Sequence, residues 1–330
     1  MRLLVYSKIS AIDYYLPQKV ELNDPDDKLT AKIGIFEKHI AAEDEFASDL
    51  AIKAAEKLFA RNNINPGEID YILYCSQSPE YYLPSTACIL QDKLSIPKTA
   101  GALDFNLGCS GFVYGLSLAK GLIESGQVKK VLLITSDTYS KYINNRDRSV
   151  KLLFGDAAAA TIIEASEIPG LENFSFGTDG KGAQNLIVPA GGIRQPLSCD
   201  QYQEAEDQYG NIRSNANLYM NGPEIFNFTL REIPKSIDNF LETNQKSMVD
   251  FDRVIFHQAN EYMLTHLRKK MRISEEKFSI QLRNCGNTVS SSIPIALKMD
   301  LDERCIKRGD HLLIVGFGVG YSWAVGSLIY

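Results

Sequence analysis

The same order of helix and strand occurs twice in this chain, about 180 residues apart. Asp70-Tyr-Ile-Leu-Tyr and Asp252-Arg-Val-Ile-Phe are similar apolar segments, and a helical pattern precedes each of them. A glycine-led turn, a helix and an apolar strand begin at Gly108 and again at Gly286. Two matches at nearly the same offset predict two similar α/β halves that arose by duplication. Chance similarity between α/β units is the alternative interpretation.

The repeat predicts an N-terminal half at residues 1–176 and a C-terminal half at residues 223–330. Residues 177–222 between them are rich in Gly, Gln and Asn and contain few apolar runs. A long irregular stretch is usually functional or mobile, so we expect this one either to cap the site or to be a solvated connector. In the second half, Pro234 is expected to kink or end the helix predicted at residues 226–241.

The composition excludes several classes of protein. Of the 330 residues, 45% are apolar and 23% are charged, which is typical of a folded globular chain. The net charge of −6 argues against nucleic acid as a partner, and no apolar run is long enough to span a membrane. The six cysteines lack CxxC spacing and the first residues lack the pattern of a signal peptide, so we expect reduced thiols in the cytoplasm.

Cys109 follows an apolar strand pattern and directly precedes a helical one, within Gly108-Cys109-Ser110-Gly111. A helix N-terminus carries partial positive charge, which we expect to stabilise the thiolate and so provide a nucleophile near neutral pH. The backbone N–H of Cys109 can also point at a developing oxyanion. The alternative is a small buried thiol that packs the helix against the strand.

His257 and Asn287 are the other candidate site residues. His257 directly follows an apolar strand, where ligand sites of open α/β sheets gather, although it could also be a structural histidine. A metal site is not expected, because His266 has the wrong helical phase and no other ligand set surrounds His257. By the repeat, Asn287 occupies the place of Cys109, so the two are expected to face each other. The Asn287 amide could donate a hydrogen bond to a carbonyl, or it could simply cap a helix.

The glycine run Gly316–Gly320 has the GxGxG spacing that is also found in dinucleotide-binding loops. That fingerprint must open a helix, whereas the residues that follow here, YSWAVGSLIY, have a strand pattern. We therefore exclude NAD and interpret the glycines as positions where the backbone approaches a ligand or turns tightly.

Taken together, the motifs GCSGF around Cys109, HQAN at His257, GNT at Asn287 and the closing GFGVGYSW form an ordered set. This set closely resembles β-ketoacyl-acyl carrier protein synthase III of the thiolase superfamily. Further similar segments are IGIFEKHIAAEDE, LPSTACILQ, LLFGDAAAA and MNGPEIF, so the resemblance spans nearly the whole chain. It implies an α/β, thiolase-like fold of five layers, αβαβα, built from two duplicated halves.

The resemblance also implies a reaction in two steps, without a bound cofactor. Cys109 would first take an acyl group from acyl-CoA or an acyl carrier protein. His257 and Asn287 would then stabilise the enolate that forms as malonyl-acyl carrier protein loses CO₂, and the carbanion would attack the acyl-enzyme. The backbone N–H groups of Cys109 and Val319 would form the oxyanion hole.

By resemblance, Leu83, Phe154 and Leu218 line the acyl pocket, and Leu83 reaches the pocket of the partner in a homodimer. Arg148 is assigned to binding of coenzyme A or carrier protein, whereas Lys28 stands where the family often has a tryptophan that stacks on adenine. The acyl donor can therefore be carried by coenzyme A or by carrier protein.

A basic cluster on the helix predicted after HQAN is the remaining candidate site, made up of Arg268, Lys269, Lys270 and Arg272. Acyl carrier proteins are acidic, so this cluster could steer their binding. An ordinary solvated helix face is the alternative.

Two other functions fit the same residues. The Cys–His–Asn site could move an acyl group to an oxygen or nitrogen acceptor without decarboxylation. The chain could also be a non-catalytic subunit of a condensing-enzyme heterodimer, although such subunits usually lose the nucleophile that is present here.

Overall fold

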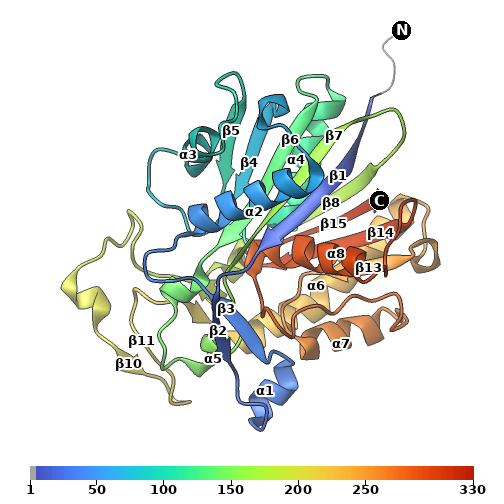
Figure 1. The fold of residues 1–330 in the computed structure, drawn as a ribbon. Helices are drawn as coiled ribbons and strands as arrows, with labels where there is room; N and C mark the ends of the chain where they lie inside the picture. Colours follow the sequence, from blue (N-terminus) through green and yellow to red (C-terminus); the bar gives the residue numbers. More distant parts are fainter. Residues whose placement is uncertain (1–4) are drawn as a thin grey trace.

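The computed structural model describes residues 5–330, which form two mixed β-sheets with helices outside and between them (Figure 1). Helices α4 and α8 contact strands of both sheets and form the middle layer. The layers are, in order, α2 (Ala47–Asn62) with α3 (Thr86–Lys93), the first sheet, α4 (Gly111–Glu124) with α8 (Ser292–Asp302), the second sheet, and α6 (Gly222–Thr243) with α7 (Glu261–Lys270). The predicted five-layer αβαβα fold is confirmed.

The two sheets share one strand order, which is the structural form of the sequence repeat. The first sheet has the order β1 (Tyr6–Tyr15), β7 (Ala157–Ser166), β6 (Lys130–Asp137), β4 (Tyr71–Cys75) and β5 (Gly101–Phe105). The second has the order β8 (Leu171–Thr178), β15 (Ser322–Ile329), β14 (His311–Gly318) and β13 (Arg253–Phe256). In each sheet, counted in the order given, the first strand pairs antiparallel with the second and the second pairs antiparallel with the third. The third pairs in parallel with the fourth. A parallel bridge from Val254 to Phe278 stands where β5 pairs in the first sheet.

Small residues on β7 let helices approach the first sheet closely from both sides. Ala158 and Ala160 pack in the buried cluster that includes α2, whereas Ala157 and Ala159 pack against Ile295 of α8. Successive side chains of a strand point to opposite faces, so one alanine run serves both helices. The middle layer is thereby held close to the sheet whose strand ends carry the site loops.

Of the two effects expected of Pro234, a kink or an end of the helix, the end is wrong, because α6 continues through this residue. Proline lacks the N–H that would bond to the carbonyl four residues earlier, that of Leu230. The Lys270 ammonium donates a hydrogen bond to this carbonyl oxygen at 2.7 Å. A side chain of α7 therefore replaces the missing helical bond.

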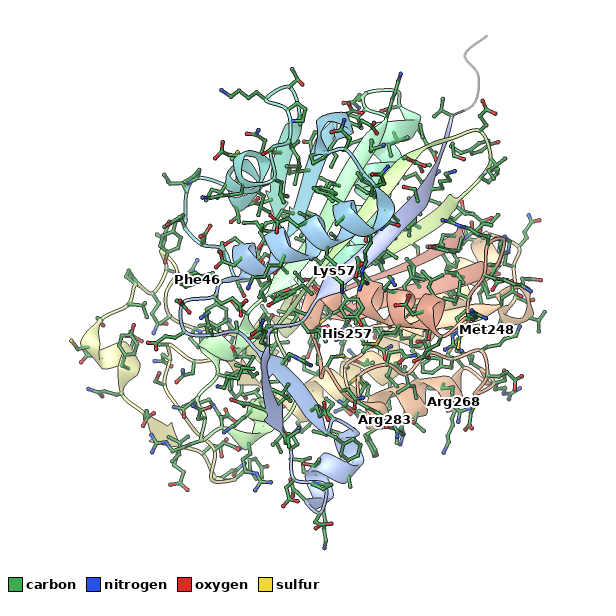
Figure 2. The ribbon with its side chains drawn as sticks, viewed as in Figure 1. Phe46, Lys57, Met248, His257, Arg268 and Arg283 are labelled. Carbon is green, nitrogen blue, oxygen red and sulfur yellow. The ribbon has the colours of Figure 1, made fainter. Side chains whose placement is uncertain are left out.

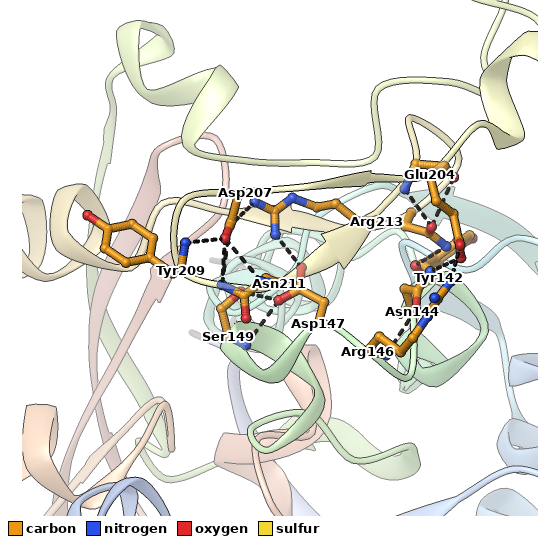
Figure 3. Close-up of polar contacts among 12 residues, drawn as sticks. Tyr142, Asn144, Arg146, Asp147, Ser149, Glu204, Asp207, Tyr209, Asn211 and Arg213 are labelled. Carbon is orange, nitrogen blue, oxygen red and sulfur yellow. Dashed lines mark hydrogen bonds and ion pairs between the residues drawn. The ribbon is translucent and has the colours of Figure 1, made fainter.

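The segment at residues 177–222 has more structure than its composition predicts. It contains the short strands β9 (Leu186–Ile187), β10 (Ala205–Glu206), β11 (Ile212–Arg213) and β12 (Tyr219–Met220), and the boundary at residue 176 falls inside β8. The Arg213 guanidinium donates to Asp147 and to Asp207, both at 2.6 Å (Figure 3). Since Asp147 caps α5 (Arg148–Lys151), its ion pair with Arg213 ties the segment to the first half, whereas the pair with Asp207 lies within the segment.

The remaining strands, β2 (Lys19–Leu22) and β3 (Glu37–Ile40), pair antiparallel around α1 (Lys28–Ile33), which contacts α7. Over residues 5–330, none of the helices combines the length and apolar character needed to cross a bilayer.

Candidate active site

Cys109 lies in the turn between β5 and α4, directly before the first turn of that helix. The glycines of β14 pack against this turn, because a Cβ at Gly318 would lie 2.8 Å from Cys109 Sγ. A Cβ at Gly316 would lie 2.7 Å from the Cα of Ser110. The glycine run therefore admits the nucleophile loop, and β15 follows it as the predicted strand.

The Cys109 side chain is buried, with 4% exposure. Burial, and then the nearby Asp137 carboxylate, raise the pKa of the thiol to about 12, so the expected resting thiolate is wrong. The backbone N–H groups of Cys109 and Val319 favour negative charge on the sulfur and lower the pKa of the thiol, but burial outweighs them.

His257 directly follows β13 and lies in the interior of the molecule (Figure 2). Its backbone N–H donates to the carbonyl of Val315 at 2.8 Å, and its ring Nδ1 lies 2.7 Å from Ser292 Oγ. Burial lowers the pKa of the imidazole to about 3, so the ring is neutral at physiological pH. Ser292 was missed in the sequence, although the run SSS after GNT places hydroxyl groups beside the site.

Asn287 is held rigidly in the loop that precedes α8. Its N–H donates to the Leu153 carbonyl at 2.9 Å, and its side-chain Oδ1 accepts from the Val289 N–H at 3.0 Å. Gly286 and Val289 have φ values of +74° and +53°, and a β-branched residue rarely adopts this region. Because Oδ1 is engaged locally, the Nδ2 amide group of Asn287 is left as a donor.

Cys109, His257 and Asn287 line one cavity of about 80 Å³, so the structure brings the three predicted residues together. Cys109 comes from the first half, and the other two come from the second. Apolar and small residues complete the walls, among them Leu153, Phe154, Leu186, Met220, Ile225, Met263 and Phe317. A neutral donor pair and a thiol in an apolar chamber can stabilise an anion that develops between them.

The three residues predicted for the acyl pocket lie in different places. Phe154 lines the cavity with Cys109, and a β-bridge pairs it with Asn287. Leu218 is buried and lines a second cavity of about 650 Å³, which Val319 also lines. Leu83 is 81% exposed and lines neither of these cavities.

The predicted basic residues are partly engaged within the chain. Arg148 pairs with Asp27 at 2.7 Å, and Arg268 pairs with Glu275 at 2.5 Å. Lys270 bonds to Leu230, whereas Lys269 is exposed. Arg272 lies beyond the end of α7, not on the helix as predicted.

Two duplicated halves, with a cysteine at one helix start facing a histidine and an asparagine from the other half, define a condensing enzyme of the thiolase fold. Two sequence models that describe 3-oxoacyl-[acyl-carrier-protein] synthase III match the chain, at residues 103–180 and, for the C-terminal model, at residues 241–329. The chain therefore belongs to the 3-oxoacyl-[acyl-carrier-protein] synthase III family.

Similar proteins cover nearly the whole chain. A β-ketoacyl-[acyl-carrier-protein] synthase III of Clostridium tetani is 37% identical over 97% of this chain and 94% of its own length. A crystal structure of a 3-oxoacyl-(acyl-carrier-protein) synthase III is 48% identical, with a TM-score of 0.96 over 98% of this chain and all of its own. A 3-oxoacyl-(acyl-carrier protein) synthase of Burkholderia xenovorans is 39% identical, with a TM-score of 0.90 over 98% of this chain and 94% of its own.

Proposed function

We propose that this chain transfers an acyl group to Cys109 and condenses it with malonyl-acyl carrier protein, with loss of CO₂. The observation that carries this proposal is the convergence of Cys109, His257 and Asn287 in one apolar cavity. Membership of the synthase III family supports the same acyltransferase activity, in fatty-acid synthesis or a specialised lipid or polyketide pathway.

In the first step, Cys109 Sγ attacks the carbonyl carbon of the donor thioester. The Cys109 N–H and the Val319 N–H stabilise the oxyanion, because both favour negative charge beside the sulfur. The bond from the acyl carbon to the donor sulfur breaks, and the departing thiolate takes the proton that Cys109 gives up. A thioester on Cys109 remains.

In the second step, malonyl-acyl carrier protein enters the same cavity and loses CO₂. The electron pair of the broken C–C bond forms an enolate, which the His257 ring and the Asn287 amide stabilise by hydrogen bonds. A neutral ring suits this role, because it donates a hydrogen bond without protonating the carboxylate that leaves. The enolate carbon attacks the acyl carbon, the bond from this carbon to Cys109 Sγ breaks, and the sulfur leaves as a thiolate that takes a proton from water.

The partners follow from this reaction. Acyl carrier protein brings the malonyl group, the acyl donor is a CoA or carrier-protein thioester, and no resident cofactor takes part in either step. The remaining proposals are a homodimer, in which the exposed Leu83 covers a partner's acyl pocket, and a cytoplasmic location. Of the predicted basic residues, the exposed Lys269 is the most available to an acidic carrier.

The test supplies acyl thioesters and malonyl-acyl carrier protein and measures both CO₂ and the intact mass of the protein. An adduct on Cys109 followed by CO₂ release is expected, and Cys109→Ala should abolish both the adduct and the β-ketoacyl product. Full product formation by Cys109→Ala would contradict the proposal.

The same measurement separates the alternatives. If the acyl group on Cys109 is transferred to an amine or an alcohol without release of CO₂, the protein is a non-decarboxylating acyltransferase. A chain that forms no adduct with any donor would be a partner subunit. The relatives named as synthases favour neither of these alternatives.

A further inference from the structure

The second cavity, of about 650 Å³, adjoins the one that holds the nucleophile. Leu186 lines both cavities, and the backbone N–H of Val319, which lines the second, lowers the pKa of the Cys109 thiol. Tyr139, another wall of the second cavity, belongs to the same buried cluster as Cys109. A Cβ at Gly108 would meet Gln77 Oε1 at 2.5 Å and Val319 Cγ1 at 2.7 Å, so two residues that line the second cavity pack directly against the nucleophile loop. An acyl group on Cys109 can therefore extend past Val319 into the second cavity.

Polar groups in this cavity are held in fixed orientations. Gln77 Nε2 donates to Asn106 Oδ1 at 3.0 Å, and the Tyr139 hydroxyl donates to Gln77 Oε1 at 2.5 Å. The backbone N–H of Gln77 donates to Asp137 at 2.7 Å, and the Tyr142 hydroxyl donates to the Gln77 carbonyl at 3.3 Å. Backbone and side chain of Gln77 are thus fixed at four points beside the nucleophile loop.

This arrangement leaves hydrogen-bond donors unused. Gln77 gives one of its two amide protons to Asn106, which lies at the solvent-exposed side of the cavity, and the Nδ2 group of Asn106 has no protein partner among residues 5–330. Both acceptor oxygens are already engaged, Oε1 by Tyr139 and Oδ1 by Gln77. A plain alkyl chain would displace water from these N–H groups without replacing the lost hydrogen bonds, whereas an oxygen atom on the chain would accept hydrogen bonds from them.

We propose that the second cavity holds the acyl group of the donor, and that Gln77 and Asn106 select chains with a hydroxyl or keto oxygen beyond the thioester carbonyl. This inference rests on the proposed function, since the chain must be attached to Cys109. The bonds made and broken are those of the first step, and the additional oxygen takes no part in them. It accepts hydrogen bonds that position the chain.

The experiment compares acyl chains of equal length on the purified full chain. Hexanoyl, 3-hydroxyhexanoyl and 5-oxohexanoyl thioesters, each on coenzyme A and on acyl carrier protein, are mixed with the protein, and the Cys109 adduct is followed by intact mass. At least one oxygenated chain should load about tenfold faster than hexanoyl, the effect of one good hydrogen bond. The variants Gln77→Leu and Asn106→Leu nearly keep side-chain volume but lose the amide. The ratio of the oxygenated to the hexanoyl loading rate should therefore fall toward one. Asn239→Leu, an exposed asparagine on α6, is the matched control and should keep the full preference.

Each outcome has one meaning. Hexanoyl loading that is as fast as both oxygenated chains in the wild type would overturn the inference, and so would a preference that survives in both variants. Hexanoyl loading that is at least as fast in the variants as in the wild type shows that they are folded and that the nucleophile is intact. Loading and condensation of hexanoyl without any preference defeats only this inference, whereas absence of every adduct defeats the proposed function as well.

Discussion

Asp137, at the end of β6 in the first half, accepts hydrogen bonds from both the hydroxyl and the N–H of Ser290 in the second half. Ser290 lies three residues after Asn287, and the other oxygen of Asp137 accepts from the Gln77 N–H at 2.7 Å. One buried carboxylate therefore joins the loop that contains Asn287 to Gln77 in the wall of the second cavity. Among residues 5–330 it has no ion-pair partner, and burial raises its pKa to about 7.

Asp137→Asn should make Cys109 more reactive. The Asp137 carboxylate is ionised above about pH 7 and repels a thiolate, so its removal should lower the pKa of Cys109. We expect the pH midpoint of iodoacetamide labelling of Cys109 to fall by on the order of one unit. Ser290→Ala keeps the charge but loses the hydroxyl bond, so its midpoint should stay near that of the wild type. An unchanged midpoint in Asp137→Asn would show that the charge does not act on the sulfur.

Asn287→Asp should block condensation but spare acyl transfer. The substitution keeps the Oδ1 that accepts from Val289 and replaces the donor amide with an acceptor. Loss of one donor to a developing oxyanion costs about 10²–10³ in rate, so CO₂ release should fall by about that factor. Formation of the Cys109 adduct, measured by mass, should continue.

Asn260→Asp is the matched control for this prediction, because Asn260 lines the same cavity and its Oδ1 caps α7 at 2.8 Å. It adds the same charge and keeps the cap. If both variants lose CO₂ release equally, the added charge and not the missing Asn287 donor is responsible.

Ser292→Ala should slow condensation through the orientation of His257. Ser292 Oγ accepts weakly from the Gln258 N–H at 3.4 Å, so its own proton can bond to His257 Nδ1. That bond leaves Nε2–H as the donor to the enolate. Without it, the ring can adopt the other tautomer, and we expect kcat for condensation to fall on the order of tenfold.

Ser291→Ala serves as the comparison for Ser292→Ala. Ser291 is buried at the same helix start but bonds to Thr135 and not to the ring. A merely structural effect would slow both variants and reduce Cys109 loading in both. The positioning role predicts slower CO₂ release in Ser292→Ala alone, with loading unchanged.

The repeat shows why the central part of the site could be predicted from the sequence. Equivalent loops in duplicated halves must face each other, so the positions of Cys109 and Asn287 predicted one chamber. Asp137 could not be predicted in this way, because its partner Ser290 lies in the other half and no local spacing indicates the contact. Ser292 and its partner His257 lie in the same half, but the SSS run does not indicate which hydroxyl group bonds to the ring. The resting state of Cys109 was predicted wrongly, because the charge of a helix end is visible in a sequence and the depth of burial is not.

The bond from Lys270 to Leu230 could have been anticipated, because a proline inside a helix leaves the carbonyl four residues earlier without its usual partner. Lys270→Met keeps the apolar stem and removes the donor. We expect the free energy of unfolding in urea to fall by about 1 kcal/mol. Lys269→Met, at the exposed neighbouring position, should leave it nearly unchanged.

A double-mutant cycle with Pro234→Ala tests whether Lys270 stabilises the protein through its bond to the Leu230 carbonyl. Alanine restores the N–H of residue 234, so the Leu230 carbonyl regains its helical bond and no longer needs Lys270. The Lys270→Met substitution should then cost clearly less in the Pro234→Ala background than in the wild type. An equal loss of unfolding free energy in both backgrounds would mean that Lys270 does not act through the Leu230 carbonyl. If Lys270→Met then also weakened binding of acyl carrier protein in both backgrounds, Lys270 would belong to the surface that binds the carrier.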